Sequence, residues 1–303
     1  MLDLVVIILN YNTRELLRGC LQSLRVQVGL NFVTCVVDNA SSDGSADRVA
    51  NDFPEVKLIR NPLNNGYPAG NNLGLRAFSF PEAPQARYAL LLNPDTLVPQ
   101  GALARMVNFA DANPDIGVVG PKLLLMDGTL DKACRRSFPT PEVSFYRFSG
   151  LSKLFPNSKR FGRYNMSYLG IDEQADIDSV VGACMLVRAE AIQKVGLLDE
   201  QFFMYGEDLD WCLRIKQAAP PQPSPVKTGE GYKVVYYPTV TVHHVKRAAS
   251  SQSVKAQFEF QRAMWLFYKK HYRASTNKLV DFVVRQGLAL RGGAALAKEI
   301  AGK

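Results

Sequence analysis

The sequence predicts an α/β protein with a mostly parallel central sheet flanked by helices. Three aliphatic runs, at residues 4–9, 32–37 and 88–92, are typical of strands that are covered on both faces of a sheet. Residues 13–26 place their leucines on one stripe, which predicts an amphipathic helix, and a second helical pattern follows at 45–53. Strands that alternate with helices in this way predict parallel strands joined by right-handed crossovers.

Later segments extend this pattern less regularly. Residues 134–168 are irregular, basic and aromatic, and residues 219–231 are rich in proline, glycine and serine, which predicts a flexible insertion. We expect one domain over residues 1–247 and a C-terminal helical extension over 248–303 that packs on it. We expect further strands at 56–59, 116–125, 180–188, 233–237 and 239–245, and further helices at 102–112, 189–195, 254–271 and 279–300.

The composition fits a large folded core. The chain has 303 residues, of which 47% are hydrophobic and 21% charged, so one large domain with an extension is a reasonable size. No apolar run reaches the roughly 18 to 20 residues that a membrane-spanning helix needs, and the first residues are typical of a strand rather than of a secretory signal. The five cysteines are scattered without a CxxC pair, which argues against zinc and disulfides and favours a cytoplasmic protein.

The net charge of +8 indicates an anionic partner. Nucleotides, phospholipid headgroups and nucleic acid all carry the required charge, so charge alone does not choose between them. The sequence contains no RNP box, zinc finger or basic zipper, and we therefore expect no nucleic-acid partner.

Polar side chains follow four of the predicted strands at their carboxyl ends. In an open parallel sheet these ends form the edge where ligands bind. Each loop alone is also typical of an ordinary turn, but four such loops on one edge suit the base, ribose and phosphates of a nucleotide. The residues are Asn10 and Tyr11, Asp38 and Asn39, Asn65 and Gly66, and Asn93 and Asp95.

The stretch "FFMYGEDLDWCLRIK" sets carboxylates directly against apolar residues. One interpretation is a helix start, where acidic residues complement the helix dipole, and Asp210 with Arg214 has the spacing of a helix-face pair. This interpretation is incomplete for Glu207 and Asp208, because a partly buried carboxylate has a raised pKa and can act as a general base.

Seven stretches, taken in this order and spacing, resemble the family-two glycosyltransferases of the GT-A fold, in particular the rhamnosyltransferase-like branch. The resemblance covers about residues 3 to 273. The stretches are "VVIILNYN", "VVDNASSDGS", "NNGYPAGNNLGL", "LLLNPDT", "GACMLVRAEAIQKVGLLDEQFFMYGEDLDWCLR", "VHH" and "RAMWLFYKKHY".

The resemblance implies a nucleotide-sugar donor, a divalent metal and transfer with inversion at the anomeric carbon. By position, Asp95 matches the last acid of the family's DXD metal motif, Asp208 the catalytic base, and His243 a histidine that approaches the metal. Glu207 would bind the acceptor or orient Asp208. The nucleotide or sugar would lie against Asn10, Tyr11, Asp38, Asn65, Gly66 and Asn72, with Asp38 accepting the imino proton of a uracil or thymine ring.

Two features depart from the family pattern. Asn93 makes the first position of the metal motif neutral, and Val245 follows the histidine pair where the family often has glycine. A nitrogen ligand fits Mn²⁺ better than Mg²⁺, but both ions remain candidates. His244 remains the alternative to His243 as the histidine that approaches the metal. We interpret His271 as structural.

The acceptor side is predicted only by class. A sugar ring could stack on Phe203, Tyr205 or Trp211. The branch implies a glycan or lipid-linked acceptor in cell-surface polysaccharide synthesis, with dTDP-rhamnose as first donor and UDP-sugars next. The basic and aromatic residues 265–273 predict either a helix packed on the core or peripheral contact with the inner face of the cell membrane. The rival functions are a nucleotidyltransferase and a non-catalytic nucleotide-sugar-binding subunit.

Overall fold

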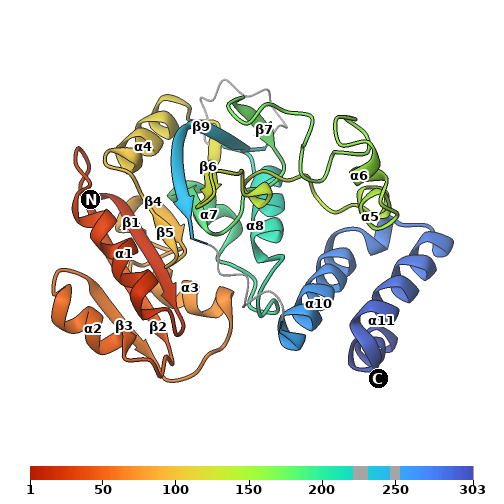
Figure 1. The fold of residues 1–303 in the computed structure, drawn as a ribbon, viewed down its shortest axis with the longest axis horizontal. Helices are drawn as coiled ribbons and strands as arrows, with labels where there is room; N and C mark the ends of the chain where they lie inside the picture. The colour runs from red at the N-terminus through yellow and green to blue at the C-terminus, as the bar shows by residue number, and fades with distance from the viewer. Residues whose placement is uncertain (221–230, 246–252, 303) are drawn as a thin grey trace.

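A nine-stranded sheet runs through the middle of the protein (Figure 1). The computed structural model describes residues 1–220, 231–245 and 253–302. Its N-terminal half is parallel, in the order β3-β2-β1-β4. These strands are β1 (Leu2–Asn10), β2 (Phe32–Asn39), β3 (Lys57–Asn61) and β4 (Ala86–Leu92). The aliphatic runs therefore form the predicted strands, and the α/β class is confirmed.

The other half of the sheet is mixed. β8 (Cys184–Arg188) is antiparallel to β4 and to β6 (Ile116–Leu125), and β6 is parallel to β9 (Lys233–His244). Two short strands, β5 (Thr96–Leu97) and β7 (Ala175–Ile177), pair antiparallel with β9. The two runs predicted at 233–237 and 239–245 are one strand, with a register shift opposite Pro121 and Lys122.

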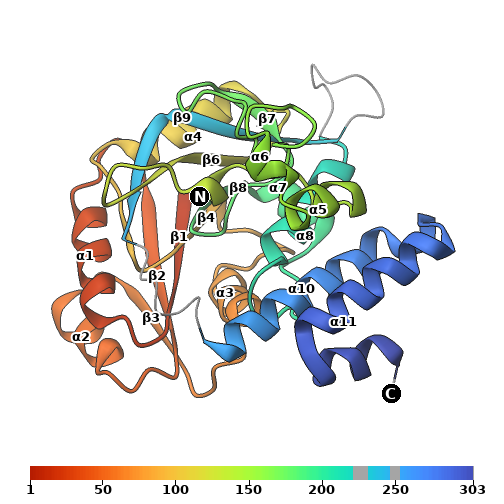
Figure 2. The ribbon, with the colours of Figure 1, turned by 45° about the vertical axis from the view of Figure 1, so that its right-hand side comes forward.

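Helices cover both faces of the sheet. In Figure 2, α1 (Arg14–Arg25) and α2 (Ser45–Asp52) lie on one face, and α3 (Tyr67–Arg76) and α8 (Glu207–Gln217) lie on the other. Helix α3 was not predicted, because its glycines and proline disfavour helix. Those glycines bring it close to β1, since a Cβ at Gly70 or Gly74 would overlap Leu9 or Ile7. The predicted helices α4 (Ala102–Ala112) and α7 (Ala189–Val195) are present.

The basic and aromatic middle segment is more ordered than the sequence suggested. It contains η1 (Lys132–Cys134), α5 (Pro141–Phe148) and α6 (Leu151–Leu154). Helix α5 starts with Thr140, whose hydroxyl accepts a hydrogen bond from the Val143 amide and so caps the helix. α5 and α6 lie at the end of the molecule away from α1 and α2 (Figure 1).

The C-terminal helices α10 (Val254–His271) and α11 (Lys278–Ala301) pack as a pair, joined by η2 (Arg273–Ser275). α11 bends at Gly293, whose φ is +75°. Trp265 and Tyr268 are buried in a cluster with α11, and Phe267 belongs to the main core. Helix packing is therefore confirmed for the aromatic residues of 265–268, which are not free to meet a membrane. The domain boundary at residue 247 stays a prediction.

A charged cluster around Asp210 fastens α10 to α8. Asp210 is fully buried and accepts hydrogen bonds from Arg214 at 2.8 Å and His271 at 2.7 Å, and Lys270 lies 2.7 Å from it. Burial alone would raise its pKa, but His271, Arg214 and Lys270 together lower the pKa of Asp210 to about 2. The predicted pair of Asp210 with Arg214 and the structural role of His271 are confirmed.

The structure does not describe two segments on which the sequence analysis touched. Most of the predicted insertion, residues 221–230, lies outside the described residues, as do residues 246–252. Within the described part, none of the helices is both long enough and apolar enough to span a lipid bilayer.

Candidate active site

The ends of β1 and β2 form one hydrogen-bonded unit. Asn10 and Asp38 are paired in the strand register, and the Asn10 amide nitrogen donates to Asp38 Oδ1 at 2.8 Å. The same nitrogen reaches Ser41 Oγ at 3.0 Å, and the Ser41 backbone amide donates to Asp38 Oδ2 at 3.0 Å. Tyr11, next to this buried unit, is half exposed. The structure thus brings the first two predicted strand ends together.

The loop after β3 joins this unit through amide side chains. Asn39 donates to Asn64 Oδ1 at 2.8 Å and accepts from Asn61 at 2.7 Å. Asn64 also accepts from the Gly66 amide at 3.1 Å. Asn65 is exposed beside it. Asn61 and Asn64 are members of the site that the sequence pattern did not identify.

Gly66 connects this loop to the acidic segment. Its φ is +93°, and a Cβ there would overlap the backbone oxygen of Phe203, so no larger residue fits. Directly after it, the Tyr67 amide donates to that same oxygen at 2.7 Å. The segment before Glu207 is therefore held against the nucleotide-side loop.

Two predicted site residues are used in packing instead. Asn72 is 1% exposed, and its amide binds the backbone of Leu198 and the carboxylate of Glu200. Trp211 is fully buried, and its indole nitrogen donates to the Gly196 carbonyl at 2.9 Å. Neither side chain presents a surface to a ligand, because core packing already surrounds it.

Asp95 lies beside a histidine of β9, but the histidine is His244. Thr96 of β5 is opposite His244, and Leu97 is opposite His243. Because successive strand residues point to opposite faces, only one of the two histidines can face Asp95. His244 Nε2 is 3.2 Å from Asp95 Oδ1. The geometry therefore corrects our preference for His243.

A second carboxylate, Asp131, orients His244 from the other side. Asp131 Oδ2 lies 2.9 Å from His244 Nδ1, and both side chains are buried. Burial lowers the pKa of His244, but Asp131 and Asp95 outweigh that effect and raise it to about 9. No local pattern in the sequence pointed to Asp131, which is 113 residues from His244 along the chain.

These residues fit a divalent metal in part. A carboxylate oxygen from Asp95 and an imidazole nitrogen from His244, once the metal has displaced its proton, are a donor set that suits Mn²⁺, and Asp131 holds the other nitrogen. Over the described ranges, no three His, Cys, Asp or Glu residues form a complete metal site. A metal held here would take further ligands from a bound substrate, as ions bound through one or two carboxylates commonly do with phosphates.

Asp208 is bound by an arginine whose side chain is only 11% exposed. Arg136 Nη2 donates to Asp208 Oδ2 at 2.6 Å, and the Gly182 amide donates to the same oxygen at 3.2 Å. The other oxygen accepts from the Leu209 amide at 2.8 Å. Burial works against the charge of Arg136, but the Asp208 carboxylate raises the pKa of Arg136 further above its ordinary value. Sequence reasoning missed Arg136, because 72 residues separate it from Asp208.

Glu207 has the opposite environment. It is 6% exposed, and its Oε2 has no hydrogen-bond partner within the described structure. Burial, followed by the charge of Asp208, raises the pKa of Glu207 to about 8. Glu207 therefore favours its neutral form at neutral pH.

The residues before these acids include the predicted acceptor contact. Tyr205 is partly exposed, has φ of +68°, and meets the Phe260 ring edge-on at 5.8 Å. Positive φ at a residue other than glycine is uncommon and is often found at functional sites. Asn12 and Ala40, in the loops after β1 and β2, share this property.

Comparisons with known proteins agree on one family. The model of the family described as Glycosyl transferase family 2 matches residues 5–196. Over 294 residues the chain is 24% identical to an N-acetylglucosaminyl-diphospho-decaprenol L-rhamnosyltransferase of Mycobacterium tuberculosis, covering 95% of this chain and 91% of that protein. Over 215 residues it is 27% identical to the low-salt glycan biosynthesis hexosyltransferase Agl10 of Haloferax volcanii, covering 71% of this chain and 62% of that protein.

The fold is similar to that of a solved glycosyltransferase, S. aureus TarS, with a TM-score of 0.55 and 15% sequence identity. The likeness covers 95% of this chain but 42% of the TarS chain, so this chain spans less than two thirds of the length of TarS and of the hexosyltransferase. Since the family model covers well over half of the sequence, and the fold agrees, the chain belongs to glycosyl transferase family 2 and is a glycosyltransferase of the GT-A fold.

Proposed function

We propose that the protein transfers a sugar, with inversion, from a nucleotide-diphosphate donor to a glycan or lipid-linked acceptor in the synthesis of a cell-surface polysaccharide. The relatives named a rhamnosyltransferase and a hexosyltransferase support this class of reaction. Rhamnose carried by dTDP is the first candidate donor, and UDP-linked sugars are the second.

One observation carries the proposal. The backbone of residues 182 and 183 touches both halves of the site, because the Gly182 amide donates to Asp208 and the Ala183 carbonyl accepts from the Asn93 amide at 2.9 Å. The loop that holds Asp95 and the acid at the start of α8 therefore flank the same two residues. A donor diphosphate near Asp95 would have its sugar within reach of Asp208.

The nucleotide would lie along the strand ends. Asp38 would accept the imino proton of the base, with Asn10 fixing its carboxylate. Tyr11 and Asn65 are exposed and free to contact the base or ribose, and Gly66 allows the chain to approach closely. Asn39 would position the loop that carries these groups.

Charge on the leaving diphosphate must be balanced as the glycosidic bond to the donor breaks. A divalent metal, Mn²⁺ or Mg²⁺, supplies Lewis-acid stabilisation of that charge when it is bound. Asp95 and His244 would hold it, and Asp131 would keep the imidazole of His244 in the correct orientation. Asn93 leaves one charge fewer here than a full DXD motif has, so affinity for the metal would rely more on the substrate.

The acceptor hydroxyl needs a base on the face opposite the diphosphate. Asp208 would remove its proton as the oxygen bonds to the anomeric carbon and the bond to the diphosphate breaks. An ionised carboxylate offers about four lone-pair sites, so Asp208 can accept a further hydrogen bond beside Arg136, Gly182 and Leu209. Glu207, protonated at neutral pH, would bind an acceptor oxygen, and Tyr205 would stack on the acceptor sugar.

A donor screen with a single substitution tests the proposal. Purified protein is incubated with dTDP- and UDP-sugars and Mn²⁺ or Mg²⁺, and release of the nucleoside diphosphate and binding of the nucleotide are both measured. Asp208→Asn should abolish most turnover and leave nucleotide binding intact, whereas Glu190→Gln, an exposed acid on α7, should change neither. Binding without turnover in the unaltered protein would instead support the non-catalytic subunit. Release of pyrophosphate from a nucleoside triphosphate with a sugar phosphate would support a nucleotidyltransferase.

A further inference from the structure

The segment 141–168, which we call the α5–α6 lobe, is strongly basic. It contains five Lys or Arg residues and one acid, Glu142, and so carries a charge of +4 out of the +8 of the whole chain. All five cations are exposed. Ion pairing removes little of this charge, because Arg160 pairs with Glu142, whereas Lys153, Lys159 and Arg163 have no carboxylate at ion-pair distance among the described residues.

The same lobe exposes large apolar side chains between its cations. Phe145 is 62% exposed, Leu154 is 70% exposed and Phe155 is 47% exposed. Phe148, at the end of α5, is 40% exposed. Single exposed apolar residues are ordinary, but a group of them on one short segment marks an interaction surface.

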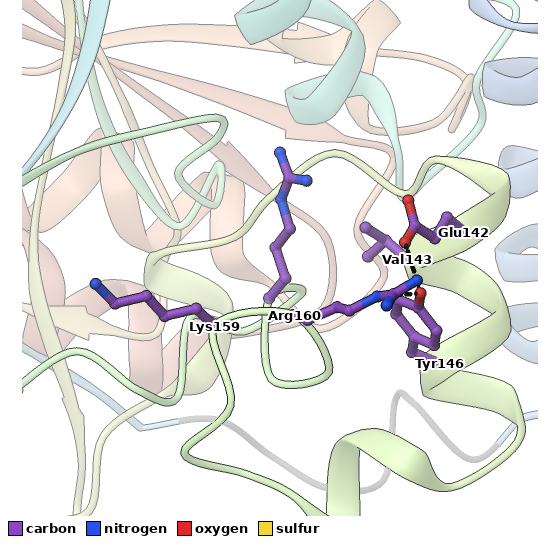
Figure 3. A pocket seen from close by; sticks show the side chains of 6 residues that line it. Glu142, Val143, Tyr146, Lys159 and Arg160 are labelled. Atoms are coloured by element: carbon purple, nitrogen blue, oxygen red, sulfur yellow. Dashed lines mark hydrogen bonds and ion pairs between the residues drawn. The ribbon is translucent and has the colours of Figure 1, made fainter.

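The lobe has its own packing, so this exposure does not come from a loose loop. The Tyr146 hydroxyl donates to Glu142 at 2.5 Å and accepts from Arg160 Nε at 2.7 Å, and the Tyr146 ring meets the Phe161 ring edge-on at 4.9 Å. Figure 3 shows Arg160 directed toward Glu142 and Tyr146, while Lys159 extends to the other side. These residues border an open cavity of about 310 Å³.

Helix α11 continues the surface. The Arg291 guanidinium lies 4.2 Å from the centre of the Phe148 ring, and Leu290 beside it is 84% exposed. Leu279, Phe282 and Val283 are also more than half exposed, although the opposite side of α11 is packed on α10. An amphipathic surface of aromatic and aliphatic residues among cations is the composition that lies in the interface of an anionic membrane.

We infer that the α5–α6 lobe, with the adjoining part of α11, binds the surface of a bilayer that contains anionic phospholipids. Charge complementarity favours this partner over a second copy of the chain, because two lobes of charge +4 would repel each other. The lobe also lies next to the candidate base, since the Ser137 amide, adjacent to Arg136, donates to the Tyr164 carbonyl of the lobe at 2.9 Å. A membrane-bound lobe would therefore hold the acceptor side of the site near the lipid surface.

The experiment measures binding to vesicles, which needs neither donor nor acceptor. The whole protein is sedimented with vesicles of phosphatidylcholine alone and of phosphatidylcholine with phosphatidylglycerol. We expect binding to the anionic vesicles that weakens with added salt. Each cation near such a surface contributes about five-fold, so Lys153→Gln, Lys159→Gln and Arg163→Gln together should lower the partition coefficient about 100-fold.

A matched control changes the net charge equally at other exposed sites. Arg18→Gln, Arg60→Gln and Arg105→Gln remove three exposed cations from α1, β3 and α4. This control triple should keep most of the vesicle binding. The double variant Phe145→Ser with Leu154→Ser should reduce vesicle binding although the net charge of the protein is unchanged. Thermal unfolding of each variant verifies that the fold is kept. We expect the fold to be kept because the substituted residues are exposed.

Three results would overturn the inference: no binding to anionic vesicles, equal loss in the control triple, or a dimer in sedimentation equilibrium that the lobe substitutions dissociate. The lobe variants should still release nucleoside diphosphate from the donor in the absence of an acceptor. If the unaltered protein binds vesicles but turns over no donor, the proposed function fails while the membrane surface stands.

Discussion

Replacing Arg136 tests how the candidate base is kept in its active form. The Arg136 and Asp208 side chains are 11% and 8% exposed, with 2.6 Å between Nη2 and Oδ2. At a charge separation of about 4 Å and an effective dielectric constant near 20, their attraction is roughly 4 kcal/mol. Removing one partner of a buried pair leaves the other charge uncompensated and costs about 3–5 kcal/mol. We therefore expect Arg136→Met to destabilise the protein by about that amount at neutral pH.

The loss should depend on pH, and this dependence identifies its cause. Without the guanidinium the neutral form of the carboxyl is favoured, and a neutral acid needs no cation. The destabilisation by Arg136→Met should therefore shrink as the pH falls, and the acid limb of the pH–rate profile should move to higher pH. Urea unfolding gives the first quantity, and kcat/KM against pH gives the second.

The neighbouring arginine supplies the control. Arg135 is also buried, but its guanidinium binds the carbonyls of Leu169 and Gly170. Arg135→Met should destabilise the protein with little dependence on pH and leave the acid limb in place. A double-mutant cycle of Arg136→Met with Asp208→Asn should give a coupling of about 2–4 kcal/mol. Coupling near zero, or the same pH dependence for both arginine variants, would refute the reasoning.

Three further substitutions give distinct outcomes. The pKa of Glu207 rises from 4.5 to about 8 on folding, so the protein loses stability as the pH rises through that window. Glu207→Gln should therefore raise the melting temperature more near pH 9 than near pH 5. An equal rise in melting temperature at the two pH values would contradict this. The pKa of Asp210 falls from 3.8 to about 2 on folding. This shift contributes roughly 2 kcal/mol to the free energy of unfolding above about pH 4, and the contribution is lost as the pH falls toward 2. In urea unfolding, Asp210→Asn should therefore be less stable than the parent near neutral pH, and the difference in stability should narrow in acid. His244→Ala should weaken Mn²⁺ binding in the presence of the nucleoside diphosphate by at least about ten-fold, as measured by calorimetry, and His243→Ala should not. If His243→Ala weakened Mn²⁺ binding and His244→Ala did not, His243 would again be the metal-facing histidine.

The sequence predicted the first half of the fold well because local pattern and tertiary structure agree there. The aliphatic runs at β1, β2 and β4 are covered on both faces, as their composition indicated. Helix α3 was missed since its glycines are unfavourable locally and are needed only for close contact with β1. The short strands β5 and β7 form because they pair with β9. A run of two or three residues is too short to show the alternation that predicts a strand.

The site was predictable where each residue acts through its place on a strand. Asn10 and Asp38 met because parallel strands end at the same edge. The choice between His243 and His244 depends on which face of β9 is turned toward Asp95, and that phase is set by the pairing with β5. Asp131 and Arg136 are more than seventy residues from their partners along the chain, so no local sequence pattern predicts these two contacts.

The carboxyl groups of Glu207 and Asp208 show most clearly what sequence cannot supply. Glu207 and Asp208 are adjacent and chemically alike, so their order in the chain does not separate a base from a proton-bearing group. Their neighbours do: among the described residues, Asp208 receives three hydrogen bonds, one of them from a guanidinium, whereas Glu207 is buried and its Oε2 has no partner there, which favours the neutral form of Glu207. Environments that push two acids apart in this way assign them different roles. In the proposed reaction Asp208 would accept the proton of the acceptor hydroxyl and Glu207 would donate a hydrogen bond to the acceptor, and the position of Arg136 beside Asp208 supports this division of roles.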